Sequence, residues 1–270
     1  MTLKERHMSD TLVPYLSQSI AWTLLSRSPL HAWHEHPMLG GAGREPTQAM
    51  ETGTLAHQMV LGGDRVVTLD FPDWRTNAAK AARDELRAAG KTPVLRKHIE
   101  AIEPVRDSVL RTLADYGIDL GAMHVEERME WTQDGVLCAG TPDAWGERIC
   151  LDLKTMPELP SPSELARKMC GGSWPMQRRA YLDGLERGPD PEGAGRRKWI
   201  WVLAETEPPF ASTIATCDAV VQELGRHQWI KALARWKALL DSGYEAPWKY
   251  PSLINVEAPL YVSKQLEDLT

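Results

Sequence analysis

Apolar positions recur at helical spacing through the first half of the chain and then give way to short strand-like runs. The spacing predicts helices over 17–25, 47–61, 75–89 and 94–116, the first capped by Ser17 or Ser19 and ending before Pro29. Short β runs follow at 123–131, 136–141 and 148–154, separated by Asp134-Gly135 and Trp145-Gly146 turns. A helix over 163–186, broken near Gly171-Gly172, precedes strands at 198–204 and 210–215 and a helix over 217–241.

This order of elements predicts an α/β fold, in which a mixed central β-sheet is flanked by helices and joined by a helical N-terminal layer. We interpret residues 1–270 as a single domain. Its parts are a mainly helical segment (1–120), a sheet-centred core (121–242) and an extended C-terminal tail (243–270).

Composition narrows the class of protein. Hydrophobic residues make up 43% of the chain and charged residues 25%, as in ordinary globular proteins. No apolar run is long enough to span a membrane, and residues 1–10 lack the apolar stretch of a secretory signal, so we expect a cytoplasmic protein. The four cysteines (138, 150, 170 and 217) match no zinc or iron–sulfur spacing.

The net charge of −6 is unfavourable for nucleic-acid binding, but the charges are unevenly distributed along the chain. Lys and Arg outnumber Asp and Glu by 9 to 5 in residues 75–111 and by 8 to 5 in residues 161–200. Between them, residues 112–160 carry 10 acidic and 3 basic residues. An acidic centre between two basic segments is compatible with a cation site beside a phosphate-binding surface.

Candidate chemistry centres on Asp152 and Lys154. They lie two apart on a predicted strand, so both side chains leave one face while Leu151 and Leu153 enter the core on the other. Asp143 ends the neighbouring strand, where a hairpin brings its carboxylate toward Asp152. Two carboxylates suit a hard divalent cation, and the lysine suits a phosphate or an attacking water. Taken alone, the same pair is typical of a solvated ion pair on a sheet face.

A helix follows with Gln177 and Tyr181 four residues apart, on one face. Arg178 and Arg179 beside them offer donors to phosphates. The alternative is an ordinary amphipathic helix with a packed tyrosine and solvated arginines.

Two further residues could join this constellation. His57 lies on a helix rich in small residues that can approach a sheet closely, and it offers a nitrogen ligand or a phosphate contact. Glu127 could add a carboxylate, although the run of glutamates around it also fits a solvated strand edge.

Other patterns leave alternatives open. His31, His34 and His36 form a ligand-rich cluster that is equally explained by a polar helix end before Pro37. The chain has eleven tryptophans but only two phenylalanines. Tryptophan side chains can form the core, form a subunit interface or stack on the bases at a frayed DNA end. The residues to which these alternatives apply are Trp199, Trp201, Trp229, Trp236 and Trp248. No nucleophile elbow, phosphate loop or dinucleotide fingerprint occurs.

The motifs, taken in order, resemble the PD-(D/E)XK nucleases and are most similar to the RecE (exonuclease VIII) type of phages and prophages. They are Ser-Pro-x-His (28–31), Gly-Thr-x-x-His (53–57), Glu-Arg-x-x-Trp (127–131), Pro-Asp (142–143), Asp-Leu-Lys-Thr (152–155) and Gln-x-x-Ala-Tyr (177–181). The resemblance covers roughly residues 15–205. It implies a restriction-endonuclease-like core and Mg²⁺-dependent hydrolysis of phosphodiester bonds, with Mn²⁺ as an alternative cofactor.

Site roles follow from the same resemblance. It implies that Asp143 and Asp152 are metal ligands, with His57 as a further ligand, and that Lys154 is the catalytic lysine. Glu127, Gln177 and Tyr181 take supporting roles.

The resemblance also implies activity and partners. The expected activity is 5′→3′ degradation of linear duplex DNA from its ends, leaving 3′ overhangs for a phage single-strand annealing protein, by a ring-shaped homo-oligomer. The alternatives are an endonuclease of the same fold and a DNA-end-binding module without catalysis.

Overall fold

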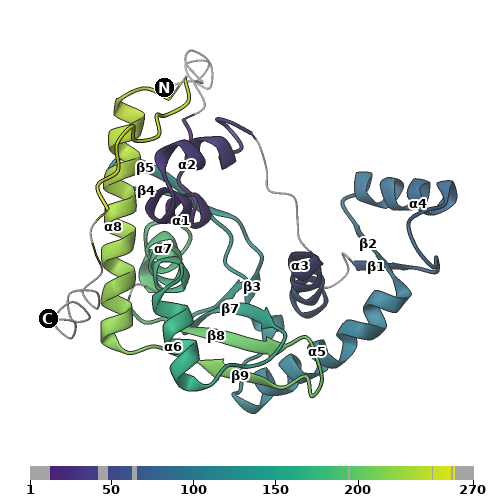
Figure 1. Cartoon of the computed structure of the whole chain (residues 1–270). Helices are drawn as coiled ribbons and strands as arrows, with labels where there is room; N and C mark the ends of the chain where they lie inside the picture. The colour runs from purple at the N-terminus through teal and green to yellow at the C-terminus, as the bar shows by residue number, and fades with distance from the viewer. Residues whose placement is uncertain are drawn as a thin grey trace, which may run out of the picture.

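The computed structural model describes residues 13–41, 48–62, 66–193, 195–244, 246–256 and 258, with the backbone alone for 48–52. Its helices are α1 (Gln18–Ser26), α2 (Pro29–Glu35), α3 (Gln48–Leu61), α4 (Asn77–Ala88), α5 (Arg96–Asp115), α6 (Pro162–Cys170), α7 (Trp174–Arg187) and α8 (Ala219–Asp241). Its strands are β1 (Val66–Leu69), β2 (Thr92–Leu95), β3 (His124–Val125), β4 (Met129–Gln133), β5 (Val136–Gly140), β6 (Ala144–Trp145), β7 (Ile149–Met156), β8 (Lys198–Glu205) and β9 (Ser212–Ala215). Figure 1 shows their arrangement.

A five-stranded mixed sheet of order β3-β6-β7-β8-β9 organises the fold. Strands β7 and β8 pair in parallel, and the other neighbours pair antiparallel. Strand β8 alternates between two cores: Trp199, Trp201 and Leu203 face one, and Ile200, Val202 and Ala204 face the other. A strand covered by helices on both faces needs apolar residues at successive positions, which is the pattern of β8 from Trp199 to Ala204. The predicted α/β fold with a mixed sheet flanked by helices is therefore confirmed.

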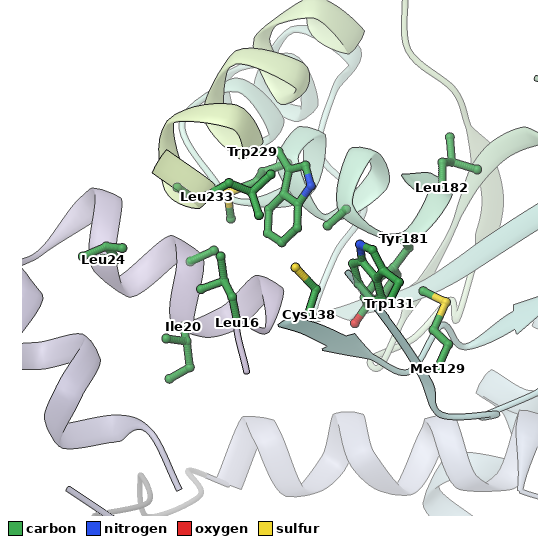
Figure 2. Packing of buried hydrophobic residues seen from close by; sticks show 14 of the residues in the cluster. Leu16, Ile20, Leu24, Met129, Trp131, Cys138, Tyr181, Leu182, Trp229 and Leu233 are labelled. Carbon is green, nitrogen blue, oxygen red and sulfur yellow. The ribbon is translucent and has the colours of Figure 1, made fainter. Parts of the chain in front are cut away.

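The larger core lies between the sheet and helices α1, α7 and α8. Figure 2 shows Trp229 reaching from α8 toward Trp131 of β4 and Cys138 of β5, with Leu16 and Ile20 beside them. The Trp229 indole N–H donates to Gln133 Oε1 at 2.9 Å, so the ring is buried without leaving its donor unpaired. The five tryptophans that the sequence left open (199, 201, 229, 236 and 248) are all buried in this core, not on a stacking or subunit surface.

The second core lies on the opposite face of the sheet, beneath α3 and α5. Leu151 and Leu153 of β7 pack there with Ala56 of α3 and with Val105 and Val109 of α5. Because Leu151 and Leu153 point to this side, Asp152 and Lys154 point to the α7 side, as strand alternation predicts.

The predicted strand over 123–131 is wrong as one element. It breaks at Glu126, whose φ of 48° interrupts the extended backbone, so that β3 joins the central sheet and β4 pairs with β5 in a hairpin of its own. Positive φ at both Asp134 and Gly135 confirms the predicted tight turn of that hairpin. The strand next to β7 is consequently the two-residue β6, which the sequence pattern presented as a turn.

Three smaller elements, α2, β1 and β2, were also missed. Pro29 follows the end of α1 as predicted, but it is also the first residue of α2, with Ser28 as the N-cap. Strands β1 and β2 form a separate parallel pair around α4, although Pro93 had suggested only a break between helices. The break at Gly171-Gly172 between α6 and α7 is confirmed. None of the helices described is both long enough and apolar enough to cross a membrane.

Candidate active site

Asp152 and Lys154 lie together on the α7 face of β7. Asp152 is buried, with 2% of its side chain exposed, and its Oδ2 lies 2.7 Å from Lys154 Nζ. Lys154 remains 23% exposed, so its ammonium stands between the buried carboxylate and solvent. An ion pair buried at one end and open at the other is well placed to meet an anionic substrate.

Gln177 of α7 completes the contacts of this pair. Its amide Nε2 donates to Asp152 Oδ1 at 2.7 Å, and its Oε1 accepts from Lys154 Nζ at 3.0 Å. The amide therefore satisfies one oxygen of the carboxylate and one N–H of the ammonium at the same time. Helix α7 reaches this position because the chain restarts it at Trp174-Pro175 after the Gly171-Gly172 break, with proline in its first turn.

Asp143 approaches from the loop between β5 and β6. Its Oδ2 accepts a hydrogen bond of 2.6 Å from the backbone N–H of Leu153, one residue after Asp152. The predicted proximity of Asp143 to Asp152 thus holds, although the neighbouring strand is β6 and not the 136–141 strand. We call Asp143, Asp152, Lys154 and Gln177 the polar cluster.

Tyr181 braces the loop that carries Asp143. It is buried one helical turn after Gln177 and hydrogen-bonds with the Gln177 side chain and the Thr141 backbone. Its ring fills the space above Gly140, where a Cβ would lie 2.5 Å from Tyr181 Cε1. Burial raises the pKa of the Tyr181 phenol above its ordinary value, so this hydroxyl stays protonated and acts as a structural contact.

His57 joins the cluster from the other face of the sheet. Its Nδ1 lies 3.4 Å from Asp143 Oδ2, and the imidazole also hydrogen-bonds with the Leu153 backbone. Helix α3 comes this close because it has glycine at position 53, where a Cβ would lie 3.0 Å from Thr155 Oγ1. The expectation that small residues let this helix approach the sheet is confirmed at Gly53.

The electrostatics of the cluster call for a positive charge. Burial, followed by the negative charge of Asp152, raises the pKa of the Asp143 carboxyl well above its usual range. Burial lowers the pKa of His57 and keeps its imidazole neutral, which is the form that binds metals. Two neighbouring carboxylates that resist joint ionisation are stabilised by a cation placed between them.

These donors fit a divalent cation of the Mg²⁺ class. Among the residues described, no three His, Cys, Asp or Glu side chains form a ready-made metal site. Mg²⁺ does not require one, because it is commonly held by one or two carboxylates while water and substrate phosphates fill its other positions. Asp143 and Asp152 supply that number, and the buried Oδ2 of Asp152 faces the Lys154 ammonium at 2.7 Å.

The structure does not bring Glu127 into the cluster. Its side chain is 58% exposed, and its Oε2 pairs with His124 Nδ1 at 2.8 Å. The neighbouring Glu126 lies closer: its N–H donates to the Asp143 carbonyl at 3.0 Å, and its charge raises the pKa of both Asp143 and His57. The positive φ at Glu126 shifts the alternation of side chains at this point, and no sequence pattern signalled it.

The two candidate phosphate-binding arginines are engaged within the protein. Arg178 donates to Gln222 Oε1 of α8 at 3.0 Å, and Arg179 forms an ion pair with the buried Asp183. Asp183 also contacts Arg187, with Nη1 and Oδ1 3.3 Å apart, and accepts from Gln133. Arg178 therefore joins α7 to α8, whereas the ion pair of Arg179 lies within α7 itself.

Sequence reasoning missed Trp174, which lies over the lysine of the cluster. Lys154 Nζ is 5.6 Å from the centroid of its ring, a cation–π distance, and the ring stacks on Trp201. The histidine cluster forms no metal site in the described part of the chain. His31 Nδ1 bonds with Ser28 Oγ at 2.6 Å, and the buried His36 bonds with the Tyr15 carbonyl and the Met38 N–H.

Comparison with known proteins identifies the fold. No protein-family model and no curated protein matches the chain. Among solved structures it is similar to the crystal structure of a "putative exonuclease" from Eubacterium rectale, with a TM-score of 0.59 and 11% sequence identity, over 98% of this chain and 97% of that one. At this identity the likeness shows a shared, nuclease-like fold and leaves the chemistry to the residues of the site.

Proposed function

We propose that this protein is a Mg²⁺-dependent exodeoxyribonuclease with a PD-(D/E)XK core of the RecE type, acting on the ends of linear duplex DNA. The observation that carries the proposal is the gathering of Asp143, Asp152, Lys154 and Gln177 from three separate segments. The side chains of Asp152, Lys154 and Gln177 lie within hydrogen-bonding distance of one another, and Asp143 accepts from the backbone N–H of Leu153, between Asp152 and Lys154. The shared fold with a protein described as an exonuclease supports the same conclusion.

Each residue of the cluster has a role that its contacts support. Asp143 and Asp152 would hold the cation, with His57 as a neutral nitrogen donor beside Asp143. A bound Mg²⁺ supplies an activated water and neutralises a phosphate oxygen. Lys154 has three N–H donors and uses two of them on Asp152 and Gln177, which leaves one for the phosphate or the attacking water.

Gln177 and Tyr181 position these groups and do not take part in the reaction themselves. Gln177 fixes the ammonium of Lys154 relative to the Asp152 carboxylate, and Tyr181 fixes the loop before Asp143. Such positioning matters because a misplacement of about 1 Å can cost on the order of 10²-fold in rate.

The proposal extends to the features that the resemblance implies. These are 5′→3′ polarity, 3′ overhangs passed to a single-strand annealing protein, and a ring-shaped homo-oligomer. They rest on the motifs and not on the geometry of the cluster.

Hydrolysis of linear duplex DNA by the full-length protein tests the proposal. We expect nucleotide release with Mg²⁺, none with EDTA, and loss of activity in Asp152→Asn and Lys154→Met. Asp107→Asn is the matched control, because this exposed carboxylate of α5 pairs with Arg106 away from the cluster. Equal behaviour with Mg²⁺ and EDTA, or full activity in Asp152→Asn, would refute the proposal.

The same assay separates the two rival functions. A covalently closed circle is left intact by an exonuclease and is nicked by an endonuclease of the same fold. A DNA-end-binding module without catalysis binds the linear duplex and releases nothing. Labelling the 5′ or the 3′ end of each strand then reports the polarity of degradation.

A further inference from the structure

A small unit made of β1, α4 and β2 projects from the rest of the protein. We call residues 66–95 the arm. It packs on α5 and stands at the end of the molecule opposite α8 (Figure 1). Of its residues, only Ala79, Val94 and Leu95 are fully buried. A unit with so small an apolar core contributes little to the stability of the fold, so its surface is the feature to explain.

That surface carries a basic stripe along α4. Lys80, Arg83 and Arg87 follow one another at helical spacings of three and four residues, which places them on one side of the helix. Lys80 and Arg87 are exposed and have no ion pair or side-chain hydrogen bond with any residue that the structure describes. Arg83 bonds with Asp84 and lies 5.9 Å from the ring centroid of Trp74.

Four arginines of the second basic segment are less available. Arg178, Arg179 and Arg187 of α7 are bound to Gln222 and Asp183, and Arg197 is paired with Asp190. A phosphate could bind these arginines only by competing with those partners. Lys80 and Arg87 can bind an anion without that cost.

The spacing and position of the stripe fit duplex DNA. Lys80 and Arg87 are seven positions apart on α4. This spacing is about 10 Å along a helix, close to the ~12 Å width of the major groove. In the sequence, helix α3, which carries His57 beside the polar cluster, precedes β1, and both α3 and the arm pack on α5.

We propose that the arm binds the phosphate backbone of duplex DNA through Lys80 and Arg87 and holds the duplex beside the polar cluster. The ligand is the substrate of the proposed nuclease, so this inference rests on the proposed function. It assigns the duplex contact to α4 in place of the arginines of α7.

Equilibrium binding of a duplex in EDTA tests the arm apart from hydrolysis. The probe is a fluorescein-labelled blunt duplex of about 24 base pairs, followed by anisotropy between about 50 and 200 mM NaCl. Lys80→Ala/Arg87→Ala is compared with Lys231→Ala/Arg235→Ala, which removes the same charge from exposed positions on α8. For the arm variant we expect binding weaker by on the order of 10- to 50-fold at about 0.1 M salt, and a salt slope smaller by about 2. The α8 variant should bind like the wild type.

Three results would overturn the inference: no duplex binding by the wild type, unchanged binding by the arm variant, or an equal loss in the α8 variant. Thermal melts followed by circular dichroism show whether each variant is folded. The charge-preserving Lys80→Arg/Arg87→Lys variant should restore wild-type binding if charge, and not helix structure, is responsible.

Hydrolysis with Mg²⁺ distinguishes this inference from the proposed function. In an active enzyme the arm variant should need more duplex for half-maximal rate while the rate at saturation is unchanged. If the wild type binds through the arm but releases no nucleotide, the proposed function fails and the arm assignment stands. If hydrolysis is normal and the arm variant binds normally, the arm assignment fails alone.

Discussion

Replacing Gly140 by alanine tests whether Tyr181 braces the loop before Asp143. The added Cβ would lie 2.5 Å from Tyr181 Cε1 and 3.1 Å from Cδ1, whereas carbon atoms pack at about 3.5–4.0 Å. The ring or the strand must therefore move by about 1 Å. The Tyr181 ring is buried and hydrogen-bonded at its hydroxyl, so little free space is available for that movement.

Gly140→Ala should lower the free energy of unfolding, although the replacement of glycine by alanine in a strand would otherwise raise it. Gly140 has no positive φ, so alanine at this strand position should by itself gain about 0.5–1 kcal/mol. Overpacking of a buried contact costs about 1–3 kcal/mol. We expect a net loss of about 1–2 kcal/mol in the free energy of unfolding. In a protein of this size that loss lowers the Tm by roughly 2–5 °C. Hydrolysis should fall on the order of 10²-fold, because Thr141 and Gln177, the two partners of Tyr181, both support the cluster.

A double-mutant cycle supplies the control. Urea unfolding is followed by tryptophan fluorescence for the wild type, Gly140→Ala, Tyr181→Ala and the double variant. With the ring removed, Gly140→Ala should be neutral or slightly stabilising, which gives a coupling energy of about 2 kcal/mol. A Gly140→Ala variant as stable as the wild type, or one whose loss persists without the Tyr181 ring, would show that the close contact has no consequence.

Three further outcomes follow from the geometry. Glu126→Gln should reduce hydrolysis more than Glu127→Gln, since only the first carries its charge near Asp143; equal effects in the two variants would contradict this placement. Mg²⁺ should raise the thermal midpoint of the wild type but not of Asp143→Asn, and a gain of equal size in both would exclude Asp143 as a ligand. His36 is fully buried and burial lowers its pKa, so the folded state excludes a proton that the unfolded chain accepts near its ordinary value of about 6.5. The free energy of unfolding should therefore fall as pH drops from about 7.5 to about 5.5, and less steeply in His36→Gln; an unchanged slope would assign the dependence to other groups.

The centre of the cluster could be predicted from the sequence because it depends on short-range geometry. Alternation along β7 alone places Asp152 and Lys154 on one face with Leu151 and Leu153 on the other. The i, i+4 relation of Gln177 and Tyr181 likewise holds in any α-helix. Neither inference depended on which strand pairs with β7. The error of expecting the 136–141 strand beside β7, where β6 lies, therefore did not affect them.

The rest of the cluster depends on contacts that no local pattern encodes. Glu126 faces Asp143 only because its own φ is positive, a conformation uncommon for glutamate. The two-residue β6 exists because it pairs with both β3 and β7, and its sequence shows no alternation. Arg178 looks solvated on a helical wheel, yet Gln222 of α8 lies within its reach after folding.

The tryptophans of this chain occupy two kinds of environment, the core and the neighbourhood of a cation. At positions 199, 201, 229 and 236 of the strands and helices, and at 248 in the tail, the indole serves as core, which accounts for a chain with only two phenylalanines. Trp74 lies shortly before α4, Trp174 begins α7, and both are half-buried. Each ring lies within cation–π distance of a positively charged side chain, Arg83 for Trp74 and Lys154 for Trp174. An indole in the core can be exchanged for another large apolar group at a cost in packing alone. One that lies over a cation also contributes to where that charge stands, as Trp174 does for Lys154 and Trp74 for Arg83.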